Sequence, residues 1–188
     1  SDNAADVFVY DTRKDSDGGA WRHRTQNTSW YIEGASATRG SRKEFPSVAV
    51  IVSFTNGLKI YDGDDPNLPL WMEWDTTNGR FMLRGCTNGQ IAAMNGIIAL
   101  SNASTYGGVV LIYFISDTAK SYRKLGSNNG SEGNWLGNIA SRNDYSGNNF
   151  SNVNGGNVLA SLISENTKDV AMTVLPNAPI DVSTGLPT

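Results

Sequence analysis

The segment from Asp62 to Pro66 has the residue types of a cation-binding turn. Asp62, Asp64 and Asp65 surround Gly63, and carboxylate oxygens placed around a glycine are the hard ligands that calcium prefers. The spacing differs from that of an EF-hand, because no glutamate follows six residues after Gly63 and no helical pattern flanks the segment. The pattern therefore favours a structural turn, with a calcium site formed by the three aspartates as the second interpretation.

Sugar binding is a second chemistry that the residue types allow. The region 126–157 consists mostly of glycine, asparagine and serine, yet it contains Trp135 and Tyr145 near Asn134 and Asn143. Exposed aromatic rings stack on the apolar faces of sugars, while amides bond the sugar hydroxyl groups. We therefore predict these four residues as the glycan-binding candidates. The other tryptophans are expected to be core anchors, namely Trp21, Trp30, Trp71 and Trp74.

The sequence assigns no catalytic residue. Its one histidine, His23, lies between two arginines, and its one cysteine, Cys86, has no partner that marks it as a nucleophile. A general base needs a partner within hydrogen-bond reach, and a zinc site needs several His or Cys ligands. We therefore expect a surface histidine and a structural thiol. Paired carboxylates could still cleave a polysaccharide, although no spacing among the 18 acidic residues selects a pair.

The elements that would position these residues repeat along the chain. Short apolar strands end in tyrosine at Tyr10, Tyr61 and Tyr113, at intervals of 51 and 52 residues, and each continues through an aspartate-containing turn. A fixed period of about 50 residues suits a four-stranded propeller blade. We predict an all-β fold of repeated four-stranded antiparallel units of about 50 residues that resemble propeller blades, with a β-sandwich as the alternative.

Strands are expected where apolar residues alternate or β-branched residues run together between glycine and asparagine. The run 48–52 is continuously apolar and is predicted to be buried on both faces. The polar stretch 35–44 is predicted to be an exposed loop. Asn-Gly pairs such as 95–96 indicate tight hairpin turns, because both central residues of a type I′ turn need positive φ. The predicted strands cover residues 7–10, 21–25, 48–52, 58–61, 71–74, 80–84, 90–94, 97–100, 109–115, 157–164 and 170–175, and residues 30–32 are predicted to close the first unit.

The predicted organisation is one β-repeat domain with extensions at both ends. Three units would not close a propeller, which typically needs four to eight blades, so the repeat predicts either a longer chain or an assembly of several copies. A net charge of −3 with mixed signs predicts no nucleic-acid partner, and the longest apolar run is too short for membrane insertion. The predicted parts are an N-terminal linker at 1–6, the β-repeat domain at 7–175 with the polar loop at 126–157, and a proline-containing tail or linker to a missing region at 176–188.

Four segments carry a resemblance to a known family: DVFVYDT at 6–12, GAWR at 19–22, TRGSRKEFP at 38–46 and IYDGDDP at 60–66. Over about residues 4–125 the chain resembles uncharacterised, propeller-like proteins that are associated with the virion or tail of tailed bacteriophages, mostly marine ones. The resemblance implies a virus particle that contacts a bacterial surface, and it supplies no catalytic residues.

The predicted function is that of a phage structural or adhesion protein, a component of a tail fibre, nozzle or spike. It would act through contacts with copies of itself or other virion proteins, and through contact with bacterial surface polysaccharide, where several weak sites on one particle raise avidity. Its expected location is the virion tail, or else the extracellular space. The alternatives are a polysaccharide-degrading enzyme on a β-scaffold and a secreted carbohydrate-binding module. No cofactor is predicted apart from calcium at the acidic turn.

Overall fold

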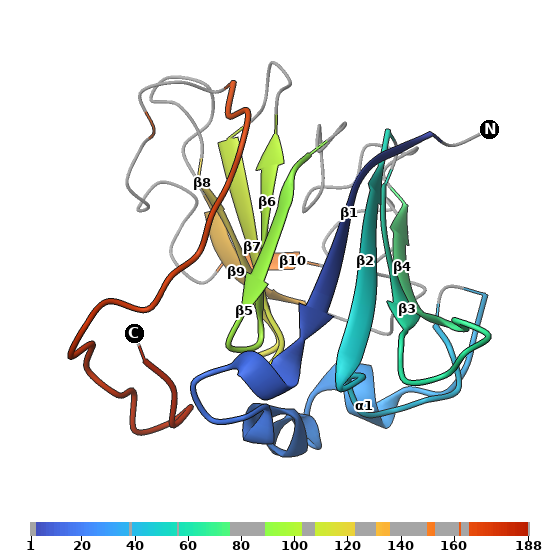
Figure 1. Cartoon of the computed structure of the whole chain (residues 1–188), viewed down its shortest axis with the longest axis horizontal. Helices are drawn as coiled ribbons and strands as arrows, with labels where there is room; N and C mark the ends of the chain where they lie inside the picture. The colour runs from blue at the N-terminus through green and yellow to red at the C-terminus, as the bar shows by residue number, and fades with distance from the viewer. Residues whose placement is uncertain are drawn as a thin grey trace.

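The computed structural model describes residues 3–37, 39–55, 57–75, 89–102, 108–122, 131–135, 150–152, 162 and 166–187. These residues form two antiparallel β-sheets and a few short helices (Figure 1), which confirms the all-β prediction. None of the helices in this part of the chain has both the length and the apolar character needed to cross a lipid bilayer.

The first sheet is a meander in which each strand pairs with the next strand in the sequence. Along the middle of the sheet the side chains alternate as a half-exposed strand requires, with Leu58 and Ile60 buried and Lys59 on the opposite face. In sheet order the strands are β1 (Ala4–Asp11), β2 (Val48–Phe54), β3 (Gly57–Asp62) and β4 (Leu70–Asp75).

The second sheet is also a meander. The hairpin between its first two strands turns at Asn95 and Gly96, whose φ angles are 52° and 73°, and this confirms the Asn-Gly turn predicted at that position. Its strands are β5 (Ile91–Met94), β6 (Ile97–Asn102), β7 (Gly108–Tyr113), β8 (Thr118–Tyr122), β9 (Ser131–Trp135) and β10 (Phe150–Asn152).

The predicted repeat corresponds to these sheets in part. Tyr61 lies in β3 and Tyr113 lies in β7, and each of these is the third strand of its sheet in sequence order. The interval from Tyr61 to Tyr113 therefore joins corresponding strands of the two sheets. Tyr10 lies in β1, which is the first strand of its sheet, so the interval from Tyr10 to Tyr61 does not join corresponding strands. Among the described residues neither sheet closes on itself or curls, and the larger one has six strands rather than four.

The structure corrects the sequence prediction at residues 21–25, because they form a short helix where a strand was expected. Residues 21–25 lie in the 3-10 helix η2 (Ala20–Thr25), and residues 30–32 lie in α1 (Ser29–Ile32), after the shorter turn η1 (Thr12–Lys14). In η2 Trp21 and Thr25 are buried while the His23 side chain is 66 % exposed, so the burial follows a helical period and not an alternating one.

An aromatic cluster joins this helical segment to both sheets. Phe45 lies at its centre, with ring centroids 4.9 Å from Trp71, 4.8 Å from Phe114 and 5.2 Å from Trp21. Such edge-to-face and tilted contacts add to the stabilisation from burial. The prediction that the tryptophans outside the polar loop are core anchors is confirmed, because each is at most 2 % exposed: Trp21, Trp30, Trp71 and Trp74.

A bulge explains how two tryptophans three residues apart can both face the core. Side chains alternate along a strand, so Trp71 and Trp74 would otherwise point to opposite faces. In the β3–β4 pair, Ile60 opposes Met72 and Tyr61 opposes Leu70, which leaves Trp71 as the additional residue.

Arg39 corrects the prediction that residues 35–44 form an exposed loop, because its side chain is only 1 % exposed. Its guanidinium donates hydrogen bonds to the backbone carbonyls of Trp30, Gly40, Lys43 and Trp71 at 2.9–3.3 Å, and it lies 4.7 Å from the Trp71 ring centroid. Burial lowers the pKa of Arg39 to about 10, so the group is still charged at neutral pH. One arginine thus connects α1 to β4.

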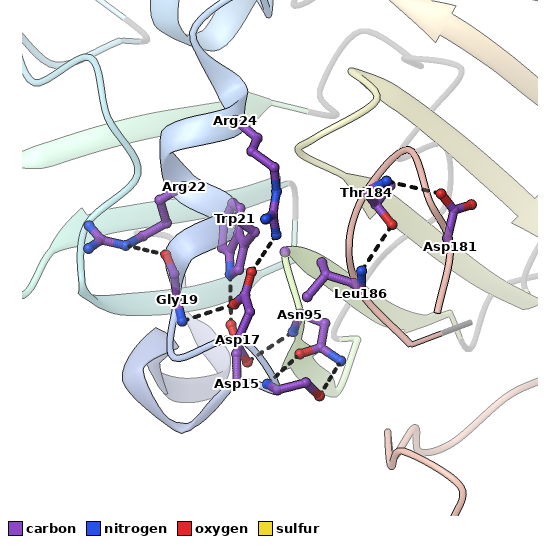
Figure 2. A network of polar contacts seen from close by, with 12 residues as sticks. Asp15, Asp17, Gly19, Trp21, Arg22, Arg24, Asn95, Asp181, Thr184 and Leu186 are labelled. Atoms are coloured by element: carbon purple, nitrogen blue, oxygen red, sulfur yellow. Dashed lines mark hydrogen bonds and ion pairs between the residues drawn. The ribbon is translucent and has the colours of Figure 1, made fainter. Parts of the chain in front are cut away.

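The C-terminal segment is anchored at its end. Leu186 is buried in the core, and the Asp181 carboxylate accepts hydrogen bonds from the backbone N–H groups of Ser183 and Thr184, which closes a turn. Figure 2 shows the bond from Thr184 to Asp181. The predicted strand at 170–175 is wrong, since these residues are outside the strands of both sheets. Of the predicted strand 157–164 only residue 162 is described, and residues 80–84, also predicted as a strand, lie outside the described residues.

We expect Gly96→Ala to be more destabilising than Gly18→Ala, although both glycines have positive φ, 73° and 66°. A Cβ atom at position 96 would lie 2.9 Å from the buried indole of Trp21, whereas one at position 18 has no atom within 4 Å. We expect losses of about 1 kcal/mol for Gly18→Ala and about 3 kcal/mol for Gly96→Ala in the free energy of unfolding, measured by urea denaturation. Equal losses would contradict the close contact between this hairpin and Trp21.

Candidate functional site

The acidic turn that the sequence analysis singled out connects β3 to β4. Asp62 is buried at the end of β3, and both of its carboxylate oxygens accept hydrogen bonds from Nη1 of Arg42, at 2.7 and 2.9 Å. The same Arg42 nitrogen lies 2.8 Å from Oδ2 of Asp64. The guanidinium therefore occupies the position between two carboxylates that a bound cation would take.

Asp64 is held further by the backbone. Its carboxylate accepts hydrogen bonds from the N–H groups of Ser47 and Val48, at 2.8 and 3.0 Å, at the point where β2 begins. Partial burial alone would raise the pKa of Asp64, but these two N–H groups and Arg42 outweigh it and hold the pKa below its usual value. The carboxylate thus ties the β3–β4 turn to the start of β2.

Asp65 belongs to the turn itself, where its carboxylate accepts from the backbone and side-chain N–H groups of Asn67. Within the described ranges, no three His, Cys, Asp or Glu side chains gather as the ligands of a metal ion would. The geometry of Asp62, Asp64 and Asp65 favours the structural-turn interpretation, and the calcium site stays a prediction.

The glycan candidates lie where the structure describes little. Asn134 and Trp135 are in β9 by their backbone, but their side chains lie outside the described residues, as do Tyr145 and Asn143 entirely. The assignment of these four residues to sugar binding therefore stays a prediction.

His23 has a surface position, as expected. Its Nδ1 lies 2.7 Å from Oε1 of Glu44, and its side chain is 66 % exposed. This contact joins η2 to the segment that precedes Phe45, and it gives His23 a structural partner.

The structure reveals a surface that the sequence analysis did not identify. On the face of the first sheet directed away from the core, β1 and β2 present only valines over two residue pairs, Val7 with Val52 and Val9 with Val50, and Val7 and Val9 are 56 % and 62 % exposed. Val48 and Val50 are half-buried and Val52 is buried, so the prediction that the run 48–52 is buried on both faces is wrong at Val48 and Val50 and holds at Val52. We call this surface the valine face, formed by Val7, Val9, Val48, Val50 and Val52.

Charged pairs border the valine face. At the end of β1, the guanidinium of Arg13 lies 2.7 Å from the carboxylate of Asp11. On β3 and β4, Nζ of Lys59 lies 3.3 Å from the carboxylate of Glu73. A contiguous apolar surface with a polar rim is characteristic of an interaction site. The sequence contains a signal for this surface in the segment 7–11, because apolar or aromatic residues fall on both faces of the strand and only one of these faces can be directed towards the core.

Comparisons with known proteins yielded no match to a family model, a curated protein or a solved structure.

We expect Asp64→Asn to lower the free energy of unfolding by about 1.5 kcal/mol at pH 7, because it removes charge-assisted hydrogen bonds. Since the pKa of Asp64 is lower in the folded state than its ordinary 3.8, this stabilisation is present above pH 3.8 and is lost as the pH falls through the folded-state pKa. Denaturation at a series of pH values should therefore show the variant and the wild type converging in acid. Asp65→Asn is the control, and a gap that persists at low pH would contradict the assignment.

We expect calcium at about 1 mM to leave the thermal midpoint of the wild-type protein unchanged, because ligand binding raises the midpoint only where the folded state offers a site. Arg42→Ala should unfold at a lower temperature and should respond to calcium, since the carboxylates of Asp62 and Asp64 lose their partner. A midpoint that rises with calcium in the wild type would instead support the calcium site.

Proposed function

We propose that the protein is a structural component of a phage particle, part of a tail fibre, nozzle or spike, that works through assembly with other copies of itself or with other virion proteins. The observation that carries the proposal is the valine face. Two of its side chains, Val7 and Val9, are more than half exposed on a regular strand, and burying such surface on assembly is favourable in proportion to its area.

The proposal includes the finer description of the fold, in which each sheet is a blade-like unit of a larger arrangement. Strands β2 to β4 and strands β6 to β8 follow one another in the same antiparallel order in their sheets, and Tyr113 is the last residue of β7 while Tyr61 is the last but one of β3. Neighbouring blades of a propeller pack face to face. If the two sheets were blades of an incomplete ring, the outer sheet would expose an apolar face such as the valine face. This supports further sheets beyond the two described here.

Contact with bacterial surface polysaccharide is the second part of the proposal. It depends on Trp135, Tyr145, Asn134 and Asn143, and weak binding by each copy is enough where several copies act together. A polysaccharide-degrading enzyme would use the same residues to hold a substrate that it cleaves, and a secreted carbohydrate-binding module would use them outside a virus particle. The experiment therefore has to separate binding from cleavage and a particle-bound protein from a secreted one.

The test starts from purified phage particles that encode the chain. We expect mass spectrometry to find the protein in particles, and antibodies against it to block adsorption of the particles to host cells. Purified protein should bind host polysaccharide without releasing reducing ends or unsaturated products, and Trp135→Ala should weaken this binding by about tenfold. Absence from particles would overturn the structural role, and product release would favour the enzyme.

A further inference from the structure

Residues 166–187 lie on the outside of the molecule and are attached to its core at one point. Figure 1 shows this segment, coloured orange to red, as a long trace outside both sheets. Most of its side chains are exposed, among them Leu175 at 68 % and Val182 completely. Leu186 is the one buried residue of the segment, at 4 % exposed, and it belongs to the hydrophobic core. A single side chain therefore supplies the buried apolar contact of the whole segment.

Residues 180–187 form a turn that is held together from within. The backbone N–H of Asp181 donates to the carbonyl of Leu186 at 2.9 Å, and the N–H of Gly185 donates to the carbonyl of Asp181 at 2.7 Å. The carboxylate of Asp181 accepts from two further N–H groups of the same turn. Among the described residues, no hydrogen bond joins this turn to another part of the chain. We call residues 180–187 the plug.

The plug lies against the helical segment and the second sheet. A Cβ atom at Gly185 would lie 3.3 Å from Nη1 of Arg24, which is in η2. Figure 2 shows the Leu186 side chain directed towards Trp21 and the hairpin at Asn95. We call this part of the core, which receives Leu186 beside Arg24 and the hairpin, the socket. Because the plug keeps its own hydrogen bonds, withdrawing one leucine is enough to open this contact without unfolding either part.

A turn directly before the plug sets its direction. The N–H of Ala178 donates to the carbonyl of Leu175 at 3.1 Å, with Pro176 and Asn177 as the central residues. Asn177 has a φ of 60°, in the left-handed region that asparagine tolerates and most other side chains avoid. Pro176 and the proline after Ala178 favour extended backbone in the residues that precede them. Once the turn is open, residues 175–180 can span about 20 Å.

We propose that the plug of one copy of this chain fills the socket of a second copy, with the turn at 175–178 as the hinge that opens. The chains are identical, so every contact that Leu186 makes within one chain is also available between two. Exchange of an identical element between subunits therefore forms a dimer with no loss of contacts.

The balance between the two arrangements depends on concentration. A socket meets the plug of its own chain at an effective concentration on the order of 1 mM, as for other short linkers. Exchange is consequently minor in dilute solution and extensive where copies are held side by side. This inference rests on the proposed role in assembly, to which it adds a way of connecting neighbouring copies.

Cross-linking between isotopically heavy and light copies tests the exchange. Purified full chains of both kinds carry a photoreactive leucine analogue at position 186, and they are mixed equally, incubated to constant composition and irradiated. We expect heavy–light cross-links whose share rises about fivefold between about 100 µM and about 1 mM. They should join position 186 to the same peptides as the cross-links within one chain, because an exchanged plug occupies the same socket.

The same analogue at Leu175 is the control for accidental encounters, since Leu175 is exposed and lies outside the plug. We expect it to give no heavy–light cross-links to the socket peptides. Cross-links within one chain from position 186 show that the labelled plug is docked and the protein is folded.

Substitution of Asn177 tests the hinge. Glycine adopts positive φ readily, so Asn177→Gly should keep the turn closed and lower the heavy–light share by about threefold at about 100 µM. Valine is strained at positive φ, so Asn177→Val should favour the open hinge and raise the share by about threefold. General loosening of the fold would not move the two variants in opposite directions.

The proposal is overturned if the cross-links at about 1 mM are only heavy–heavy and light–light, if the heavy–light ones reach other peptides, or if both Asn177 variants shift the share in one direction. These measurements use the purified chain and are independent of the virion role. A chain that is present in particles without exchange would contradict only the exchange, whereas exchange in a chain that is absent from particles would contradict only the virion role.

Discussion

The carboxylate of Asp15 is the interaction on which the arrangement of the two sheets depends. It accepts hydrogen bonds from the Tyr10 hydroxyl at 2.5 Å, from the Trp21 indole at 2.7 Å and from the backbone N–H of Asn95 at 2.9 Å. These three donors come from the first sheet, the helical segment and the hairpin of the second sheet. Figure 2 shows Asp15 with two of them, Trp21 and Asn95. Burial and the nearby Asp15 raise the pKa of Tyr10 above its usual value, so the hydroxyl keeps its proton and remains a donor.

A second group of contacts lies at the other end of β1. The Asp6 carboxylate accepts from the N–H of Ile91, where β5 begins, and the Ser53 hydroxyl donates to the carbonyl of Gly89. Strands β1 and β5 are thus connected at both ends and run side by side (Figure 1). This arrangement directs one face of the first sheet towards the shared core and leaves the valine face uncovered by the described residues. The exposure of the valine face therefore follows from the contacts that hold β1 and β5 side by side.

Much of the sheet structure could be predicted from the sequence, because the strands and the Asn95-Gly96 turn depend on local alternation and on φ preferences. The helical turns at Trp21 and Trp30 could not be predicted, since the order of apolar and polar residues in these two segments fits a strand as well as a helix. The buried Arg39 also escaped prediction, because its acceptors are backbone carbonyls of α1, of its own loop and of β4, and backbone acceptors leave no mark in the sequence. Residue type alone was also a poor guide at the aspartates of the turns, which suggested a cation-binding site. The carboxylates of Asp15 and Asp62, and that of Asp117, which accepts from Ser29, bind donors of the protein itself.

The central claim is that the valine face is a contact surface and not an incidental exposure of apolar residues. The most direct measurement is the concentration dependence of valine methyl signals in the NMR spectrum of the labelled protein. Val7, Val9 and Val50 should shift together as the concentration rises, while Val174 and Val182, on the C-terminal segment, should stay unchanged. Methyl signals that do not change for the first three, or changes confined to the C-terminal valines, would contradict the account.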